Sequence, residues 1–178
     1  MIVEGTYTFT APRQVVWDLL QDPEVLAKAL PGARRLEKVD EDRFEGEMQV
    51  GVGPVSAAAF KMSVELSDKV VPEGFSMTVD SKGTIGFTRG TARVELAEHE
   101  DGTLMTYRAD LKVGGKIAGV GQRVLDSASR TMTRQGLDAL NREVLTRLGA
   151  PVPAAGRRGW WIAAALVVGG VILFLLLT

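Results

Sequence analysis

The stretch MTYRADLKVGGKIAGVGQRVLDSASRTMTRQGLDALNREVLTRL, residues 105–148, decides the fold of this chain. Its first nine residues alternate between apolar and polar side chains, which is the period of a strand that buries one face. Gly114 and Gly115 then end the strand. From Lys116 onward we expect one continuous amphipathic helix about 50 Å long, because apolar residues recur at helical spacing: Ile117, Val120, Val124, Ala128, Leu137, Leu140, Val144 and Leu148.

The strand pattern repeats upstream, over residues 34–113. Turn-forming residues stand at 40–42, 72–74 and 99–102, where hairpins would join consecutive strands. Such alternation predicts an antiparallel sheet with one buried and one solvated face. Apolar side chains take every second position in runs that begin at Phe44, Ala58, Phe75, Ala92 and Met105.

The N-terminal residues predict one more strand and two short helices. The strand has an inward face of Val3, Gly5, Tyr7 and Phe9. Pro12 opens the first helix, with Thr10 or Ala11 near its cap, and we expect Asp18 to face solvent. Asp22, also expected to be exposed, and Pro23 then start a second helix that runs to Leu30.

The predicted architecture is α+β, a strongly curved antiparallel sheet wrapped around a long C-terminal helix. A curved sheet cannot touch a straight helix along its whole length, so we expect a cavity between them. Plain core packing is the alternative for each lining residue, although methionines on the sheet suit an irregular ligand. The predicted lining is Tyr7, Phe9, Trp17, Phe44, Met48, Phe60, Met62, Phe75, Met77, Ile85, Phe87, Tyr107, Ile117, Val120, Gly121, Val124 and Leu125.

The last nineteen residues, WWIAAALVVGGVILFLLLT at 160–178, carry no charge. As a helix they would be about 28 Å long, close to the hydrocarbon thickness of a bilayer. Arginines before them and tryptophans at their start are typical of a membrane interface: Arg157, Arg158, Trp160 and Trp161. We therefore predict a ligand-binding domain at 1–148, a flexible linker at 149–159 and a single-pass transmembrane tail anchor at 160–178, with the domain on the cytoplasmic face. A buried core helix is the alternative for the tail.

Composition excludes several classes of function. The chain has no cysteine, so disulfides, zinc fingers and iron–sulfur clusters are excluded. The formal net charge is −1, and no basic stripe indicates nucleic-acid binding. His99 is the single histidine and lies in a polar turn, without the companions that a metal site or a catalytic set needs. We therefore expect no metal, no catalytic residue and no nucleic-acid partner.

Glycine-rich and basic stretches are less specific. Residues 50–54, VGVGP, lack the Gly-Lys-Ser/Thr ending of a phosphate loop and fit a hairpin better. Arg34, Arg35 and Arg89 are candidates to meet lipid headgroups or an acidic partner near a cavity mouth. An ordinary solvated surface is the alternative for these arginines.

The order of strand, two short helices, LPG turn (30–32), strand meander and long helix resembles the START-like helix-grip fold, also called SRPBCC or Bet v 1-like. More narrowly, VGVGP at 50–54, GTIGFTRGTA at 83–92 and VGGK at 113–116 look like the CoxG family, named for a subunit of aerobic carbon monoxide dehydrogenase. The resemblance covers residues 1–148. It implies a non-catalytic accessory protein that associates with the cytoplasmic membrane and with a molybdenum-containing carbon monoxide dehydrogenase or a related oxidoreductase.

For some members of this family the resemblance also implies carriage of menaquinone. The first hypothesis is therefore a tethered carrier that binds menaquinone or a similar isoprenoid lipid, with no covalent cofactor, and passes it between membrane and enzyme. The alternative is an anchor that recruits the dehydrogenase without a ligand. A cyclase- or aromatase-type enzyme is less favoured, because the predicted lining offers mainly Tyr7 and Tyr107 as polar groups.

Overall fold

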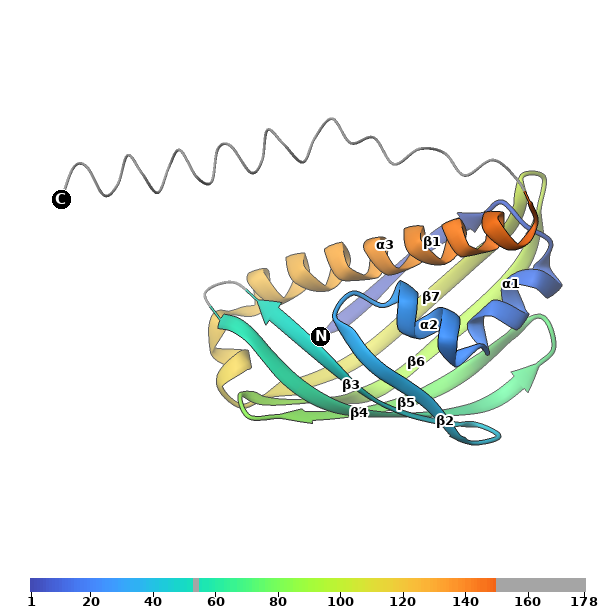
Figure 1. The fold of residues 1–178 in the computed structure, drawn as a ribbon. Coiled ribbons are helices and arrows are strands. Elements are labelled where there is room, and N and C mark those ends of the chain that lie inside the picture. The colour runs from blue at the N-terminus through green and yellow to red at the C-terminus, as the bar shows by residue number, and fades with distance from the viewer. Residues whose placement is uncertain (53–54, 150–178) are drawn as a thin grey trace, which may run out of the picture.

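A curved antiparallel sheet and one long helix account for most of the molecule (Figure 1). The structure, a computed structural model, describes residues 1–52 and 55–149. The elements are, in chain order, β1 (Ile2–Phe9), α1 (Arg13–Leu20), α2 (Pro23–Ala29), β2 (Ala33–Asp40), β3 (Arg43–Val52), β4 (Val55–Val70), β5 (Gly74–Gly83), β6 (Gly86–His99), β7 (Gly102–Gly114), the 3-10 helix η1 (Lys116–Val120) and α3 (Gln122–Arg147).

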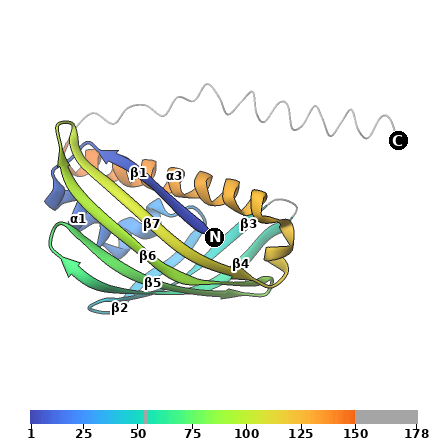
Figure 2. The same cartoon turned by 180° about the vertical axis from the view of Figure 1, so that it is seen from behind.

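Within the described residues, the sheet has seven strands in the order β1-β7-β6-β5-β4-β3-β2. Strands β2 to β7 form a meander of successive antiparallel pairs, and β1 closes the sheet by pairing with β7. Figure 2 shows the convex face of this sheet, with α3 lying behind it. The predicted α+β architecture, with two short helices after the first strand, is therefore confirmed.

The continuous helix predicted from Lys116 is wrong at its start. Residues 116–120 form a 3-10 helix, and α3 begins only at Gln122. Gly121 separates the two, with a φ of 94° that a helix cannot contain. Apolar spacing does not register such a break, because side chains on both sides of it still face the sheet.

Helices α1 and α2 fill one end of the concave face and join the C-terminal end of α3 (Figure 1). Pro12 precedes α1 and supplies no side-chain cap, in contrast to the expected cap at Thr10 or Ala11. The Asp22 carboxylate accepts hydrogen bonds from the N–H groups of Glu24 and Val25 at the start of α2. It also accepts one from Arg147 at 2.6 Å, and its side chain is 28% exposed, so Asp22 reaches solvent only in part.

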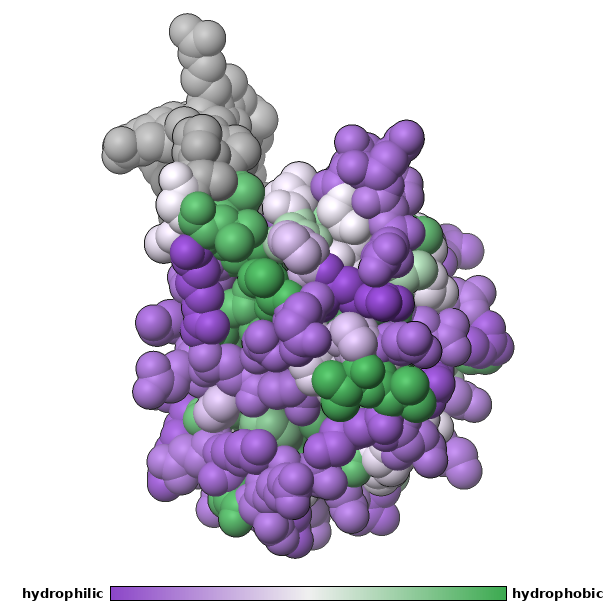
Figure 3. All heavy atoms as spheres, turned by 90° about the vertical axis from the view of Figure 1, so that its right-hand side faces the viewer, coloured by the Kyte–Doolittle hydropathy of each residue, from purple (hydrophilic) through white to green (hydrophobic). Residues whose placement is uncertain are grey.

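Figure 3 shows the end of the molecule at which α1 and the C-terminal end of α3 lie. Its surface is mostly hydrophilic, with hydrophobic areas that are separated from one another. Large hydrophobic side chains that are exposed at or near this end are Val39, Val70, Val71 and Leu148. Val70 and Val71 are adjacent at the β4–β5 turn and Leu148 follows α3, and exposed apolar side chains of this kind are ordinary on a protein surface.

The predicted linker beyond Gly149 and the predicted anchor, with Arg157, Arg158, Trp160 and Trp161, lie outside the described residues. Within residues 1–52 and 55–149, no helix has both the length and the apolar character that crossing a bilayer requires.

Candidate functional site

The strand register places the predicted inward side chains together on the concave face, under α3. Phe44 pairs with Val64, Val64 with Val79, and Val79 with Gly90, so one row crosses four strands. Because side chains alternate strictly between the faces of a sheet, the rows above and below it follow. These rows contain Met48, Phe60, Met62, Phe75, Met77, Tyr107 and Leu111.

The buried apolar residues of this interior form two separate clusters. The main cluster lies where α1, α2 and the C-terminal half of α3 meet the sheet, and includes Phe9, Trp17 and Val144. The second cluster lies at the opposite end, beneath η1 and the start of α3, and is centred on Phe60 and Ile117. The described part of the core is therefore divided along the length of α3.

Between the two clusters runs a band of inward-facing residues that pack into neither of them. Its members lie on the concave face by register, yet each is only half-buried. Apolar side chains in such a position usually bury fully against the helix above them. The band comprises Val3, Met62, Val79, Ser81, Thr88, Gly90, Ala92, Ala109 and Leu111.

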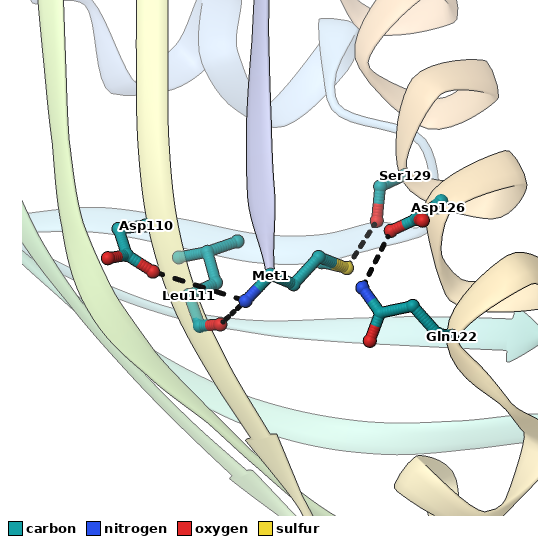
Figure 4. Close-up of polar contacts among 6 residues, drawn as sticks. All are labelled: Met1, Asp110, Leu111, Gln122, Asp126 and Ser129. Carbon is teal, nitrogen blue, oxygen red and sulfur yellow. Dashed lines mark hydrogen bonds and ion pairs between the residues drawn. The ribbon is translucent and has the colours of Figure 1, made fainter.

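The middle of α3 lies over this band and presents few large side chains to it. Ser129 and Met132 follow Leu125 at helical spacing on the inward stripe, whereas Gly136, one turn further on, packs against the end of α2 and Pro31. Figure 4 shows Met1 extending from β1 toward α3, with its sulfur 3.9 Å from the Ser129 hydroxyl. The Met1 nitrogen meanwhile bonds the Leu111 carbonyl at 2.6 Å and so continues the β1–β7 ladder. Met1 thus lines the seam between the sheet edge and the helix.

Two tyrosines are the largest polar groups on the concave face. The Tyr7 hydroxyl donates a hydrogen bond of 2.9 Å to the Asp138 carboxylate on α3. Burial first, and then the hydrogen bond and the negative charge of Asp138, raise the pKa of Tyr7 to about 12. The Tyr107 hydroxyl lies directly over Gly5, where a side chain would collide with it. Gly5 therefore makes room for this phenol on the concave face.

The predicted lining residues fall into four groups. Those in or against the main cluster are Tyr7, Phe9, Trp17, Phe44, Phe75, Met77 and Tyr107. Those in or against the second cluster are Ile85, Met48, Phe60, Ile117, Val120 and Leu125. Met62 lies in the half-buried band. Elsewhere are Phe87, Val124 and Gly121.

Phe87, Val124 and Gly121 lie away from the interior for a common reason. Near each of them the backbone interrupts the regular side-chain period of the strand or helix. Phe87 is 39% exposed on the convex face, because the tight turn before Gly86 resets the strand alternation. Val124 is 37% exposed and its neighbour Leu125 faces inward instead, since α3 starts after the break at Gly121. Gly121 itself is exposed, and an added Cβ there would meet open space.

Most of the half-buried band was absent from the predicted lining. Val79, Ala92, Ala109 and Leu111 share the alternation that identified their larger neighbours. On the strands, the predicted lining contains aromatic and methionine side chains, and these four residues are neither. A run of small inward residues in the middle of several paired strands is the signal that would have found them.

The acidic side chains and the single histidine are the candidate metal ligands of this chain. Among the described residues, no group of three or more His, Asp or Glu side chains is placed to hold a metal ion. His99 lies in the β6–β7 turn, where its Nδ1 accepts a hydrogen bond of 3.2 Å from the Asp101 N–H.

A curved sheet gripping one long helix defines the class of helix-grip proteins. Residues 5–145 match the family model of CoxG, the carbon monoxide dehydrogenase subunit of that name, and the chain belongs to that family. A search of curated proteins finds no match.

Solved structures share the fold. A conserved protein from Geobacillus kaustophilus is 26% identical, with a TM-score of 0.77 over 82% of this chain and 96% of its own. A protein from Thermus thermophilus is 18% identical, with a TM-score of 0.62 over 83% and 99%. The Zhui aromatase/cyclase from a Streptomyces species is 16% identical, with a TM-score of 0.60 over 88% and 98%. The last two are similar in fold alone.

Proposed function

We propose that this chain is a non-catalytic, membrane-tethered accessory protein of an oxidoreductase of the carbon monoxide dehydrogenase type. It binds a hydrophobic lipid such as menaquinone between the sheet and α3, and passes the lipid between membrane and enzyme. The observation that carries the proposal is the half-buried band between the two core clusters.

A bound lipid would bury the apolar surface of the half-buried band. Apolar surface removed from water contributes about 25 cal/mol per Å², so a ligand that covers the band is stabilised by burial alone. A long isoprenoid chain is flexible enough to follow an irregular lining, and Met62 and Met132 can adapt to it. Because such a lipid scarcely dissolves in water, an enzyme outside the bilayer needs an apolar carrier to reach it.

The partner and the tether are parts of the same proposal. Family membership supports a carbon monoxide dehydrogenase as the partner. The uncharged apolar sequence at 160–178 supports a tail anchor. A linker at 149–159 reaches at most about 36 Å, so the domain would sample membrane lipid at a high effective concentration.

The first test is mass spectrometry of organic extracts from residues 1–149, expressed without the tail and purified without detergent. The Geobacillus kaustophilus protein, 96% of which matches 82% of this chain, supports independent folding of this part. We expect a stoichiometric isoprenoid lipid, or uptake of added menaquinone. An empty protein that takes up no menaquinone would contradict the carrier and favour the recruitment anchor.

A pair of variants locates the ligand. Ala92 and Ala109 lie directly opposite each other on β6 and β7, and both belong to the band. Ala92→Leu should fill part of the space and lower lipid uptake about tenfold, since an added side chain there costs shape complementarity. Thr91→Leu, one residue away on the exposed convex face, is the matched control and should take up lipid like the wild type. Equal uptake by both variants would place the ligand elsewhere.

A further inference from the structure

The convex face carries a basic surface at the end of the sheet that lies next to η1. Phe87 is at its centre and 39% exposed. Around it in the strand register lie four exposed basic side chains, and we call the five together the cationic surface: Lys61, Lys82, Phe87, Arg89 and Lys112. The four charges come from four neighbouring strands, so a rigid sheet fixes their spacing.

Phe87 is held outward by its surroundings rather than left exposed by chance. Its ring lies over Gly114 on β7, where any Cβ would collide with it. The Arg89 guanidinium lies 5.7 Å from the ring centre, in the range of a cation–π contact. An exposed aromatic ring fixed in this way resembles the anchors found at the centres of protein interfaces.

The register also sets like charges against each other. Lys61 is directly opposite Lys82, and Arg89 is directly opposite Lys112, although such pairs are destabilising in a sheet. Asp80 neutralises Arg89 at 2.7 Å. Within residues 1–52 and 55–149, Lys61, Lys82 and Lys112 form no ion pair, although Lys61 also lies directly opposite Glu47 on β3. On the same face, Arg93 and Arg108 also lie opposite each other, but each of these has an acidic partner.

A hollow on the convex face adjoins the ring. It is lined by Phe87, Arg89, Gly90, Thr91, Asp110 and Lys112. Two basic side chains and Asp110 line this hollow, and Asp110 lies 4.0 Å from the Met1 ammonium. Lys112 beside the aromatic ring therefore suits an acidic protrusion with an apolar residue next to it. The turns at the far end of the sheet carry the opposite charge, in Asp40, Glu41, Asp42, Glu98, Glu100 and Asp101.

The position of the cationic surface favours a protein over a membrane as its binding partner. The surface adjoins η1, whereas the chain leaves the domain after Leu148, at the far end of α3. Helix α3 has 26 residues, which is about 39 Å. A linker with a reach of about 36 Å therefore brings the acidic end toward a bilayer more easily than the basic end. The cationic surface then faces away from the membrane.

We propose that the cationic surface is the docking site for an acidic face of the oxidoreductase partner. This inference rests on the proposed function for the class of partner, but not on lipid binding. Fixed basic side chains would steer the encounter, and the ring of Phe87 would supply the apolar contact. Binding through such a surface weakens as salt rises.

The test measures binding of the full chain, in phosphatidylcholine nanodiscs, to purified carbon monoxide dehydrogenase from the same organism at low and high salt. Lys82→Glu with Lys112→Glu should weaken binding about tenfold or more, mainly through slower association. Phe87→Ala should weaken it about as much without changing the charge. The control is Lys28→Glu with Arg130→Glu, which changes net charge equally at exposed positions outside the surface. Circular dichroism checks that each variant is folded.

Unchanged dehydrogenase binding in both surface variants would overturn the inference. Residues 1–149 are also mixed with phosphatidylglycerol vesicles. If the charge reversal abolishes vesicle binding and leaves dehydrogenase binding intact, the surface meets lipid, and the inference again fails. If the wild-type chain does not bind the dehydrogenase, both the proposed partner and the proposed docking role of this surface are contradicted. Dehydrogenase binding by a chain that extracts no lipid would overturn only the carrier and leave the docking surface standing.

Discussion

At the scale of single residues, Tyr7 links the sheet to α3 through one hydrogen bond to Asp138. Between the ordinary pKa of 10.0 and the raised pKa of about 12, the unfolded chain releases a proton that the folded protein retains. Stability conferred by the neutral Tyr7 is thus fully present below pH 10 and is lost as pH rises through this window.

Replacement of Asp138 by Asn should lower the Tyr7 pKa, because it removes the negative charge beside the phenol while burial persists. Tyr7 and Tyr107 are the two tyrosines of the chain, so a Tyr107→Phe background isolates Tyr7 in an ultraviolet titration. Asp126→Asn, on the same helix, is the control. An Asp138→Asn midpoint equal to that of the control would show that Asp138 does not hold the proton.

Two glycines near α3 should respond oppositely to the same added methyl group. At Gly136 the methyl would lie 3.6 Å from Pro31, an ordinary contact, so Gly136→Ala should raise the free energy of unfolding by about 1 kcal/mol. At Gly121, φ is 94°, a conformation that alanine rarely adopts. Gly121→Ala should therefore lower the free energy of unfolding by about 1–3 kcal/mol. Urea denaturation measures both. A change of the same sign in the free energy of unfolding of both variants would contradict this prediction.

At the scale of elements, Asp22 joins the start of α2 to the end of α3. Partial burial of its carboxylate is outweighed by hydrogen bonds from Arg147, Val25 and Glu24, which hold the pKa below its usual range. Asp22→Ala removes both cap and ion pair and should cost about 1–2 kcal/mol. Asp22→Asn keeps a good cap and should cost less than about 1 kcal/mol.

The pH dependence separates the ion pair from the cap. The advantage of the wild type over Asp22→Asn should be full above pH 4 and should shrink as pH falls through the lowered pKa, since Asp22 then gains a proton. Chemical denaturation from neutral to acid pH measures it. A difference that stays constant would mean that the charge of Asp22 does not contribute.

Strands could be predicted from the sequence because their side-chain period is strict. Each inward residue of the runs at Phe75, Ala92 and Met105 lies on the concave face. The prediction failed where backbone geometry resets the phase, at the turn before Phe87 and at the break at Gly121. Packing of the band could not be predicted, because burial depends on how far α3 stands from the sheet.

At the scale of the whole molecule, the divided core predicts uneven local stability. The main cluster is closed by three helices, whereas the second is covered by η1 between glycines with positive φ, Gly115 and Gly121. Amide hydrogens of η1 and the first turns of α3 should therefore exchange faster than those of α1 and the last turns of α3. Hydrogen exchange with mass spectrometry measures this, and added menaquinone should slow the faster group. Equal exchange rates in both regions would contradict the lower local stability predicted around the second cluster.

The pairing of β1 with β7 sets the order in which the chain can assemble. Phe9 pairs with Thr103 and Ile2 with Asp110, so strands β2 to β6 all lie between the two paired strands in the sequence. On the ribosome β2 to β6 can form hairpins as they emerge, but β1 waits with an unpaired edge until the last strand appears. Closing so long a loop makes folding slow, and the waiting strand is a natural client for chaperones.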